Sequence, residues 1–498
     1  MGQAQADGHV LIASNRGPVS FTRGDDGRLS AKRGGGGMVS GLSAIADDAE
    51  MLWVCAALSD ADRAAARLAP DGLLDPTDVG GGATVRMLDI PQHIFHRAYN
   101  AVANSTLWFV HHMLYDTPNR PDFGPIFARD WEAFRTYNEM FAAALASAAE
   151  ARRRNETTGD GAPMRAVIQD YHLCLAPRLL AERAPDIQIA HFSHTPWAPP
   201  DYYRMLPDDV GREVLAGILG ADHAGFLCQR WADAFVDCCA AFLGAAVDRA
   251  RSRVSYRGHV TSIGVHPLGV DADQLRDRAS RRDVLSRRAA LIDATEGRKL
   301  IVRVDRTELS KNIVRGLEAY RELLRTHPEW LGNVVHLAFA YPSRHDLPEY
   351  REYTAAVQRL AHQIEDEFAE PGWNPLILEV NDDYPRSLAA CRIADVMLVN
   401  PIRDGMNLVA KEGPILSDRG CALVLSTEAG AAAELGAEAL LVNPFDIAQT
   451  AEALHTALSM DQAERVRRSE ALADAAMSMP PRVWFDDQLR ALDHIAVG

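Results

Sequence analysis

Residues 396–412 read VMLVNPIRDGMNLVAKE, and the fold can be inferred by working outward from this stretch. Its first four residues, Val396–Val399, are apolar at every position, which is typical of a parallel strand buried on both faces. A polar loop containing Gly405 follows, and the residues after the loop suit a helix. The stretch therefore predicts one strand–loop–helix unit.

Similar short apolar runs recur along the chain, separated by segments with helical spacing. In the first half they are Val10–Ala13, Ala166–Ile168, Ile187–Phe192 and Ala224–Leu227. In the second half they are Leu300–Val304, Val334–Phe339, Leu376–Val380, Val396–Val399, Leu423–Leu425 and Leu440–Val442. Alternating strands and helices predict an α/β fold with parallel sheets, and the two series predict two doubly wound domains.

The boundary between these domains is expected at residues 266–271, which read HPLGVD. We predict an N-terminal domain over residues 1–270 and a C-terminal domain over residues 271–480. The segment Trp484–Ile495 has an amphipathic pattern. We therefore expect a helix over about residues 481–498 that packs back on the first domain.

The composition excludes several classes of protein. The 498 residues are 47% hydrophobic and 24% charged, with a formal net charge of −16, which fits a multidomain globular protein and argues against nucleic-acid binding. No apolar stretch is long enough to span a bilayer, and the first ten residues, MGQAQADGHV, lack the features of a signal peptide. The seven cysteines include no CxxC pair, so we expect reduced core cysteines in a cytoplasmic protein, without zinc or disulfides.

Polar residues follow six of the apolar runs, at the ends where open parallel sheets bind ligands. These segments are Ser14–Pro18, Gln169–His172, Ser193–Pro196, Asp305–Lys311, Pro342–Arg344 and Asn400–Asn407. If both sheets present these ends to one cleft, the cleft holds several cations and a few carboxylates. That set suits a pair of ligands that carry phosphates and sugar hydroxyls.

Lys311 is notable because the chain has only four lysines, at positions 32, 299, 311 and 411. A chain that otherwise uses arginine, yet keeps lysine here near Arg306, indicates a need for a compact ammonium. We expect Ser310 to cap a helix whose apolar face includes Ile313 and Leu317. A cation at a helix N-terminus opposes the helix dipole, and a bound diphosphate would compensate for it. Alternatively, Lys311 is a solvated residue at the start of this helix and has no role in binding.

The other candidates also have structural interpretations. Arg16 could be a surface arginine, Asp404 a helix N-cap, and Asp170 and His194 capping or core residues. Four consecutive glycines at residues 34–37 form either a flexible tip or a turn that offers backbone N–H groups to a phosphate.

Taken together, these segments resemble the trehalose-6-phosphate synthases, which are retaining glycosyltransferases of family 20 with the GT-B fold. The most specific segment is Arg403–Glu412. It is supported by Ser14–Pro18, Tyr99-Asn100 through Leu107-Trp108, Asp170–Leu173, His194–Pro196, Arg306 with Lys311, and Pro342–Arg344. The resemblance covers nearly the whole chain and implies two Rossmann-like domains that face a central cleft.

The resemblance also implies roles for individual residues. The acceptor, glucose 6-phosphate, is expected to contact Arg16, Trp53, Tyr99, Trp108, Asp170 and Arg344. The nucleotide-glucose donor is expected to contact Gly36, His194, Arg306, Lys311, Asp404, Gly405, Met406, Asn407, Leu408, Val409 and Glu412. Within these sets, the residues expected to act in catalysis are Asp170, His194, Arg306, Lys311 and Asp404.

Glycosyl transfer with a nucleoside diphosphate leaving group suits these residue types, because Arg306 and Lys311 would stabilise the departing charge. The resemblance implies no cofactor and no metal, and the sequence shows no metal-ligand cluster. The partners expected are the two substrates, without nucleic acid or membrane. The sequence leaves open whether the chain forms a homo-oligomer.

The chain departs from the family pattern at several positions. Gln169 stands where the family usually has histidine, and Asn312 where it has glycine. The stretches Glu379–Tyr384 and Gly413–Leu416 are also unusual, and we expect both near the nucleotide base. These departures slightly favour GDP-glucose over the usual UDP-glucose.

Three other functions stay open from the sequence. One is a pseudo-glycosyltransferase that couples an activated cyclitol to an aminocyclitol phosphate, which the Gly413-Pro414 region resembles. The intact Arg403–Glu412 segment argues against it. The others are a non-catalytic sugar-phosphate sensor and a nucleotide-sugar epimerase on the same fold.

Overall fold

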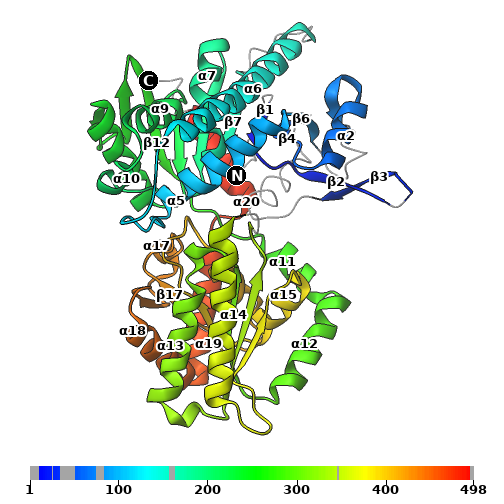
Figure 1. Cartoon of the computed structure of the whole chain (residues 1–498), viewed down its shortest axis with the longest axis vertical. Coiled ribbons are helices and arrows are strands. Elements are labelled where there is room, and N and C mark those ends of the chain that lie inside the picture. The colour runs from blue at the N-terminus through cyan, green and yellow to red at the C-terminus, as the bar shows by residue number, and fades with distance from the viewer. Residues whose placement is uncertain are drawn as a thin grey trace, which may run out of the picture. The chain divides into compact units, whose positions relative to one another are not determined.

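The computed structural model describes residues 10–24, 26–33, 51–74, 83–155, 163–344 and 347–493. The chain divides into two compact units (Figure 1). The first comprises Met1–Pro267 together with Pro481–Gly498, and the second comprises Leu268–Pro480. The predicted glycine loop at residues 34–37, including Gly36, lies outside the described residues.

The first unit contains a mostly parallel sheet whose order is β10-β11-β12-β9-β8-β7-β1-β4-β6-β5. In chain order its strands are β1 (Val10–Ser14), β4 (Met51–Ala56), β5 (Leu73–Leu74), β6 (Thr84–Leu88), β7 (Arg165–Gln169), β8 (Gln188–Ser193), β9 (His223–Phe226), β10 (Ala246–Asp248), β11 (Arg253–Tyr256) and β12 (His259–Val265). Strands β2 (Val19–Arg23) and β3 (Leu29–Arg33) form a separate antiparallel hairpin. Strands β4, β5 and β6, which follow β1 in sequence, lie on one side of β1, and the strands from β7 onward lie on its other side. Its strand order therefore reverses between β1 and β7.

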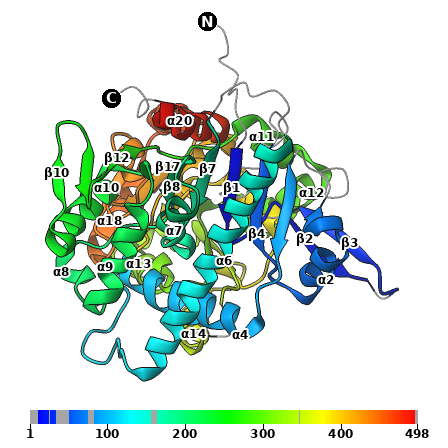
Figure 2. The same cartoon turned by 90° about the horizontal axis from the view of Figure 1, so that it is seen from above.

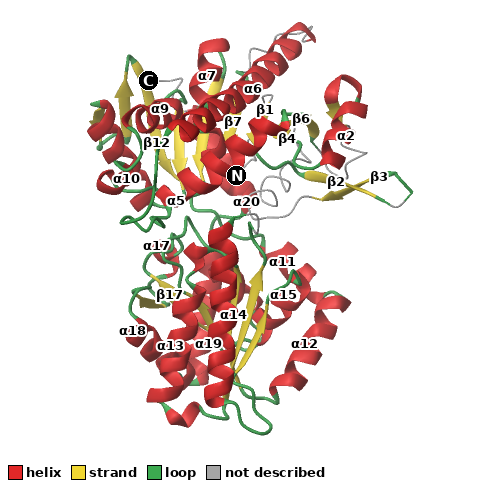
Figure 3. Cartoon of the chain, in the orientation of Figure 1, coloured by secondary structure: helices red, strands yellow, loops and turns green. Residues whose placement is uncertain are grey.

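Helices cover this sheet, as Figure 3 shows in red. They are α2 (Asp60–Leu68), α4 (Gln92–Phe95), the π-helix η2 (His96–Leu107), α5 (Trp108–His111), α6 (Pro125–Asn155), η3 (Tyr171–Leu173), α7 (Ala176–Arg183), α8 (Pro200–Tyr203), α9 (Asp208–Ile218), α10 (Gln229–Cys238), η4 (Cys239–Leu243) and α20 (Pro481–Asp493). The long helix α6 packs against β1 and β4 (Figure 2). Helix α20 packs on β8 and β9 with Trp484, Phe485, Leu489 and Leu492 buried.

The second unit contains a fully parallel sheet with the order β15-β14-β13-β16-β17-β18. Its strands are β13 (Lys299–Arg306), β14 (Val334–Tyr341), β15 (Leu376–Glu379), β16 (Val396–Val399), β17 (Ala422–Ser426) and β18 (Leu440–Val442). The sheet grows from β13 toward β15 and then from β16 toward β18, so its order reverses between β13 and β16. All its strands end at the same edge, which places the loops after β13 and β16 side by side.

Two groups of helices cover the second sheet. One group is α13 (Ile313–Thr326), α14 (Pro348–Phe368) and α18 (Ile447–Ser459), and the other is α11 (Ala272–Ser280), α12 (Arg282–Thr295), α15 (Tyr384–Ile393), α16 (Val409–Leu416), α17 (Ala432–Leu435) and α19 (Gln462–Ala476). The short turns η5 (Leu309–Lys311) and η6 (Pro328–Trp330) flank α13.

The structure confirms all ten predicted strands within a few residues and corrects one helix start. Ser310 is not an N-cap, because it lies in η5 and α13 begins only at Ile313. The N-cap position belongs to Asn312, whose φ of 57° is left-handed, and the Ile313 N–H donates to the Tyr353 hydroxyl. The predicted apolar face is correct, since Ile313 and Leu317 are buried.

Lys411 anchors the second unit through a buried ion pair. Its ammonium, with a fully buried side chain, lies 2.6 Å from Glu434 of α17 and donates to the Leu268 carbonyl oxygen at 2.8 Å. Burial lowers the pKa of Lys411, and the charge of Glu434 opposes that shift. The ion pair joins α16 to α17, and the hydrogen bond to Leu268 joins α16 to the segment where the second unit begins.

Replacing Lys411 with methionine should leave Glu434 as an uncompensated charge and destabilise the second unit by about 3 kcal/mol. The double variant Lys411→Met/Glu434→Gln should recover most of that loss. Lys299→Met is the matched control, because Lys299 pairs with Asp395 but its side chain is 39% exposed, and about 1 kcal/mol or less is expected. Calorimetric unfolding measures all three, and equal losses for Lys411→Met and Lys299→Met would contradict the buried anchor.

Candidate active site

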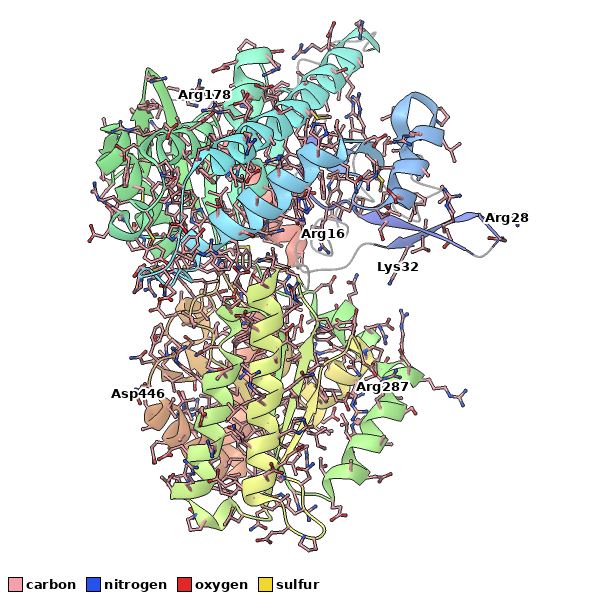
Figure 4. All side chains as sticks on the ribbon, in the orientation of Figure 1. Arg16, Arg28, Lys32, Arg178, Arg287 and Asp446 are labelled. Carbon is pink, nitrogen blue, oxygen red and sulfur yellow. The ribbon has the colours of Figure 1, made fainter. Side chains whose placement is uncertain are left out.

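The loop after β1 is held by hydrogen bonds that begin at Trp53. The Trp53 indole donates to the Ser14 hydroxyl oxygen at 2.7 Å, and Ser14 donates to the Arg16 carbonyl oxygen at 2.6 Å. The Arg16 side chain is exposed (Figure 4). Trp53 is fully buried, and its indole supports the loop that carries Arg16, while its contact with an acceptor stays a prediction.

Asp170 and His194 lie together at the ends of adjacent strands β7 and β8. Asp170 Oδ1 accepts from the His194 backbone N–H at 3.2 Å, and His194 Nε2 lies 2.7 Å from Gln169 Oε1. Because an amide oxygen only accepts, His194 carries its proton on Nε2 and leaves Nδ1 as an acceptor. Burial, with a smaller contribution from His191, lowers the pKa of His194 to about 3, so the ring is neutral near pH 7.

Tyr99 and Trp108 contact the segment that follows Asp170, through the rings of His172 and Tyr171. Tyr99 stacks on His172 with centroids 5.6 Å apart, and Trp108 lies 5.8 Å from Tyr171. The Tyr171 and His172 rings lie 4.0 Å apart, and His172 Nδ1 is 3.8 Å from Asp170 Oδ2. Both Tyr99 and Trp108 are half-buried. The first unit thus groups Tyr99, Trp108, Asp170 and His194.

The second unit brings Lys311 and Asp404 together from the loops after β13 and β16. Lys311 Nζ lies 2.6 Å from Asp404 Oδ2, and the same oxygen accepts from the Asn407 amide at 3.2 Å. Burial alone would lower the pKa of Lys311, but the carboxylates of Asp404 and Asp305 outweigh it and raise the pKa. The ammonium is therefore charged, and Asp404 orients it.

The loop that follows Asp404 has a fixed backbone. The structure places Gly405, Met406, Asn407 and Leu408 in this loop and Val409 as the first residue of α16. The Asp404 N–H donates to the Glu428 carbonyl oxygen, and the Gly430 N–H donates back to the Asp404 carbonyl oxygen, both at 3.1 Å. Asp404 is therefore not a helix N-cap, since α16 begins five residues later.

Glu308 is a site residue that the sequence analysis missed. It is fully buried, and its Oε1 lies 3.0 Å from an Arg306 guanidinium nitrogen and accepts from the Ser343 hydroxyl at 2.9 Å. Burial alone would raise its pKa, but the charges of Arg306, Arg344 and Lys311 outweigh it and hold the pKa near about 2. Its ionised carboxylate fixes Arg306, whose side chain is half exposed.

Arg344 lies in the second unit, whereas the other predicted acceptor residues lie in the first. Its guanidinium donates to the Tyr350 hydroxyl at 2.7 Å. Arg306, Arg344 and Lys311 thus give the second unit three cations near the buried carboxylate of Glu308, and Lys311 also lies beside Asp404 and Asp305. The guanidinium groups of Arg306 and Arg344 suit phosphate oxygens, which accept charge-assisted hydrogen bonds.

Glu412 lies in the first turn of α16, half-buried, and burial raises its pKa to about 7. A carboxylate at this position can accept hydrogen bonds from the hydroxyls of a ribose. The structure places Glu412 on the helix that directly follows the loop of Asp404, as expected for residues that contact one ligand.

Four residues other than glycine have positive φ in the loops that carry the candidate site residues. Asp170, Asn312, Arg344 and Asn407 all have positive φ, and they follow β7, β13, β14 and β16. Such conformations cost free energy in residues other than glycine and cluster at functional sites. They mark the same strand ends that the sequence analysis selected.

Three potential metal ligands, His327, Glu452 and His455, also come together, away from these loops, in a group that the sequence analysis missed. The two imidazole rings stack with centroids 3.7 Å apart and planes 10° apart. One ion cannot lie in the plane of both rings in this arrangement, so the group does not form a preorganised metal site.

Two further expectations can be compared with the structure. All seven cysteines are buried and free, in agreement with reduced core residues. Within the described ranges, no helix has both the length and the apolar character needed to cross a membrane.

Comparisons with known proteins agree with this geometry. The model of glycosyltransferase family 20 matches residues 8–494. The chain is 32% identical over 484 residues to the alpha,alpha-trehalose-phosphate synthase (UDP-forming) 2 of Aspergillus fumigatus, covering 94% of each chain. It is 34% identical over 397 residues to the bifunctional trehalose-6-phosphate synthase/phosphatase of Thermoproteus tenax, a match that covers 79% of this chain and 51% of that relative.

The structure is also similar to a solved protein of known ligand. This is an alpha,alpha-trehalose-phosphate synthase (UDP-forming) from Burkholderia xenovorans in complex with glucose-6-phosphate, with a TM-score of 0.82, 25% identity, and coverage of 98% of this chain and 100% of that one. Together with the two doubly wound sheets, this similarity confirms the predicted GT-B fold. The chain belongs to glycosyltransferase family 20.

Proposed function

We propose that this protein is an alpha,alpha-trehalose-6-phosphate synthase, which transfers glucose from a nucleotide-glucose to glucose 6-phosphate with retention of configuration. The observation that carries the proposal is the pairing of Lys311 with Asp404, beside Arg306, in a family 20 chain. The names of the relatives support it, since they are trehalose-phosphate synthases over nearly the whole chain. They do not favour the cyclitol-coupling alternative.

The residues of the second unit suit the donor. Arg306 and Lys311 stabilise the negative charge that develops on the leaving nucleoside diphosphate. Asp404 accepts hydrogen bonds from the hydroxyls of the transferred glucose while it orients Lys311. Glu412 accepts from the ribose hydroxyls. Arg306 is held by the buried Glu308 and Lys311 by the half-buried Asp404, so the two cations need little rearrangement in the transition state.

The residues of the first unit suit the acceptor. Arg16, Tyr99 and Trp108 suit the phosphate of glucose 6-phosphate, and Arg344 of the second unit offers a further guanidinium to a phosphate. Asp170 accepts from an acceptor hydroxyl, and the neutral His194 offers Nδ1 as an acceptor to the transferred glucose. These assignments need no metal and no cofactor, and the leaving phosphate itself takes the proton of the attacking hydroxyl.

The donor base and the cellular location are separate proposals. The relatives are named as UDP-forming, whereas the departures at Glu379–Tyr384 and Gly413–Leu416 favour GDP-glucose, which stays a prediction. The reduced, buried cysteines support a cytoplasmic location.

The direct experiment measures nucleoside diphosphate release with glucose 6-phosphate and UDP-, GDP-, ADP- or TDP-glucose in turn. Release with one donor, and trehalose 6-phosphate as the product, would establish the function and the base. Absence of release with every donor, from folded protein, would overturn the proposal.

Replacing Arg306 with alanine removes a charge-assisted contact to the donor diphosphate, so KM for the donor should rise about 10- to 100-fold. Arg16→Ala should raise KM for glucose 6-phosphate by a similar factor and leave KM for the donor unchanged. The two variants serve as controls for each other in initial-rate measurements. Equal use of glucose and glucose 6-phosphate by the wild type would contradict the role of Arg16.

Ionisation of Glu412 should govern donor use near neutral pH. Since its pKa is about 7, the carboxyl is ionised above that pH and protonated below it. The protonated form accepts hydroxyl hydrogen bonds more weakly, so kcat/KM for the donor should fall by up to about tenfold per pH unit below 7. Glu412→Gln should abolish this acidic limb in profiles measured between about pH 5.5 and 8.5. If the acidic limb were unchanged in Glu412→Gln, a group other than Glu412 would be responsible for it.

A further inference from the structure

Four side chains of the first unit form a hydrogen-bonded chain that the proposed mechanism does not use. Asp487 Oδ2 of α20 lies 2.6 Å from His266 Nδ1, and His266 Nε2 lies 2.8 Å from His223 Nε2. His223 Nδ1 in turn lies 2.8 Å from the Ser262 hydroxyl oxygen. Both imidazoles are buried, with exposures of 3% for His223 and 5% for His266.

Counting protons along this chain assigns a charge to His266. The Ser262 hydroxyl donates to the Asp222 carbonyl oxygen at 3.1 Å, so its oxygen accepts from His223 Nδ1. A neutral His223 then has a lone pair on Nε2, which accepts from His266 Nε2. His266 Nδ1 also donates, because it faces the Asp487 carboxylate. With protons on both nitrogens, His266 is an imidazolium.

The surrounding groups are consistent with this assignment. The groups that face His266 are His223 from β9, Phe192 from β8 and Asp487 from α20, with Arg490 next to Asp487 on the same helix. Ser262 from β12 faces His223. Burial lowers the pKa of His223 to about 3, and the charge of His266 acts in the same direction. The hydrogen bond from His266 lowers the pKa of Asp487.

Two glycines make room for the pair of imidazoles. Gly225 of β9 and Gly264 of β12 are directly opposite each other in the sheet. A Cβ on Gly264 would lie 2.5 Å from both His223 and His266, and a Cβ on Gly225 would lie 3.0 Å from His266 and 2.6 Å from Phe192. The backbone of both strands is therefore adapted to hold the imidazoles between them.

The chain of hydrogen bonds connects helix α20 to a predicted catalytic residue. Trp484, one turn before Asp487, is fully buried and packs on His194 with ring centroids 5.6 Å apart. It also meets Phe192 edge-on at 4.9 Å, and Phe192 lies 4.8 Å from His194. The orientation of His194 thus depends on where α20 lies.

We propose that His266 and Asp487 are positioning residues: the His266 imidazolium holds α20 on the sheet of the first unit, and α20 holds the His194 ring in place through Trp484. The kinetic part of this inference rests on the proposed function. The proton assignment does not, because it concerns the folded chain alone.

Nitrogen NMR of the full-length, histidine-labelled protein tests the proton assignment without turnover. We expect protons on both ring nitrogens of His266 and on Nδ1 only of His223. In Asp487→Asn, His266 should become neutral. A neutral His266 in the folded wild type would overturn the ionic contact, whether or not the protein has synthase activity.

Initial rates test the positioning. Asp487→Asn should lower kcat about tenfold with KM values within about twofold of the wild type, because a misplaced His194 acts on the reaction more than on binding. Asp487→Glu keeps the charge and should restore part of the rate. Trp484→Phe should lower kcat while the NMR signature of His266 is unchanged. An unchanged kcat in Trp484→Phe would overturn the path through Trp484.

The matched control is Asp493→Asn, on the same helix. Asp493 also forms an ion pair, with Arg165, but it lies at the far end of α20. The Asp493→Asn substitution should lower the unfolding temperature without changing kcat. If Asp487→Asn and Asp493→Asn both lose kcat in proportion to their loss of stability, the role of Asp487 is structural and the proposal is wrong.

Discussion

The reversal of strand order within each sheet is the constraint on which the site depends. In a doubly wound parallel sheet, the helices on the two sides of the reversal leave in opposite directions, and the loops there separate. In the first unit the reversal lies between β1 and β7, whose loops carry Arg16 and Asp170. In the second it lies between β13 and β16, whose loops carry Lys311 and Asp404. Residues far apart in sequence meet because topology brings them together.

Charge compensation then determines how these residues are held. The two cations assigned to the donor diphosphate each have an anionic partner that is at least as buried as the cation: Asp404 for Lys311 and Glu308 for Arg306. Such partners cost free energy to desolvate, and that cost is recovered only when the geometry is good. The arrangement gives guanidinium and ammonium groups fixed positions before any anion arrives. In the first unit the neutral His194 is held by its hydrogen bond to the Gln169 amide and by aromatic contacts with Phe192 and Trp484.

Much of this could be predicted from the sequence, for identifiable reasons. Strands buried on both faces are visible as runs without polar residues, and the strand ends are where the polar segments begin. What could not be predicted depends on three-dimensional burial. The sequence does not show that Trp53 is fully buried, and Glu308 is a common residue type whose role comes from the three cations near it. Helix α13 begins after Asn312 and not after Ser310, because the left-handed conformation of Asn312 ends the preceding turn. Such a conformation leaves only a weak signal in the sequence. The strands β4 and β6 were missed, although MLWVCA is apolar at all its positions.

The first unit is built from two separate pieces of chain, since α20 follows the entire second unit in sequence. During synthesis, Met1–Pro267 leaves the ribosome first, yet Phe192 and His266 then lack the helix that covers them. The second unit, Leu268–Pro480, is continuous and can complete its core before α20 emerges. The order of folding is thereby inverted relative to the order of synthesis: the domain made first is the one finished last. Apolar surface on β8 and β9 stays uncovered through that interval, which makes this face the one most in need of protection in the nascent chain.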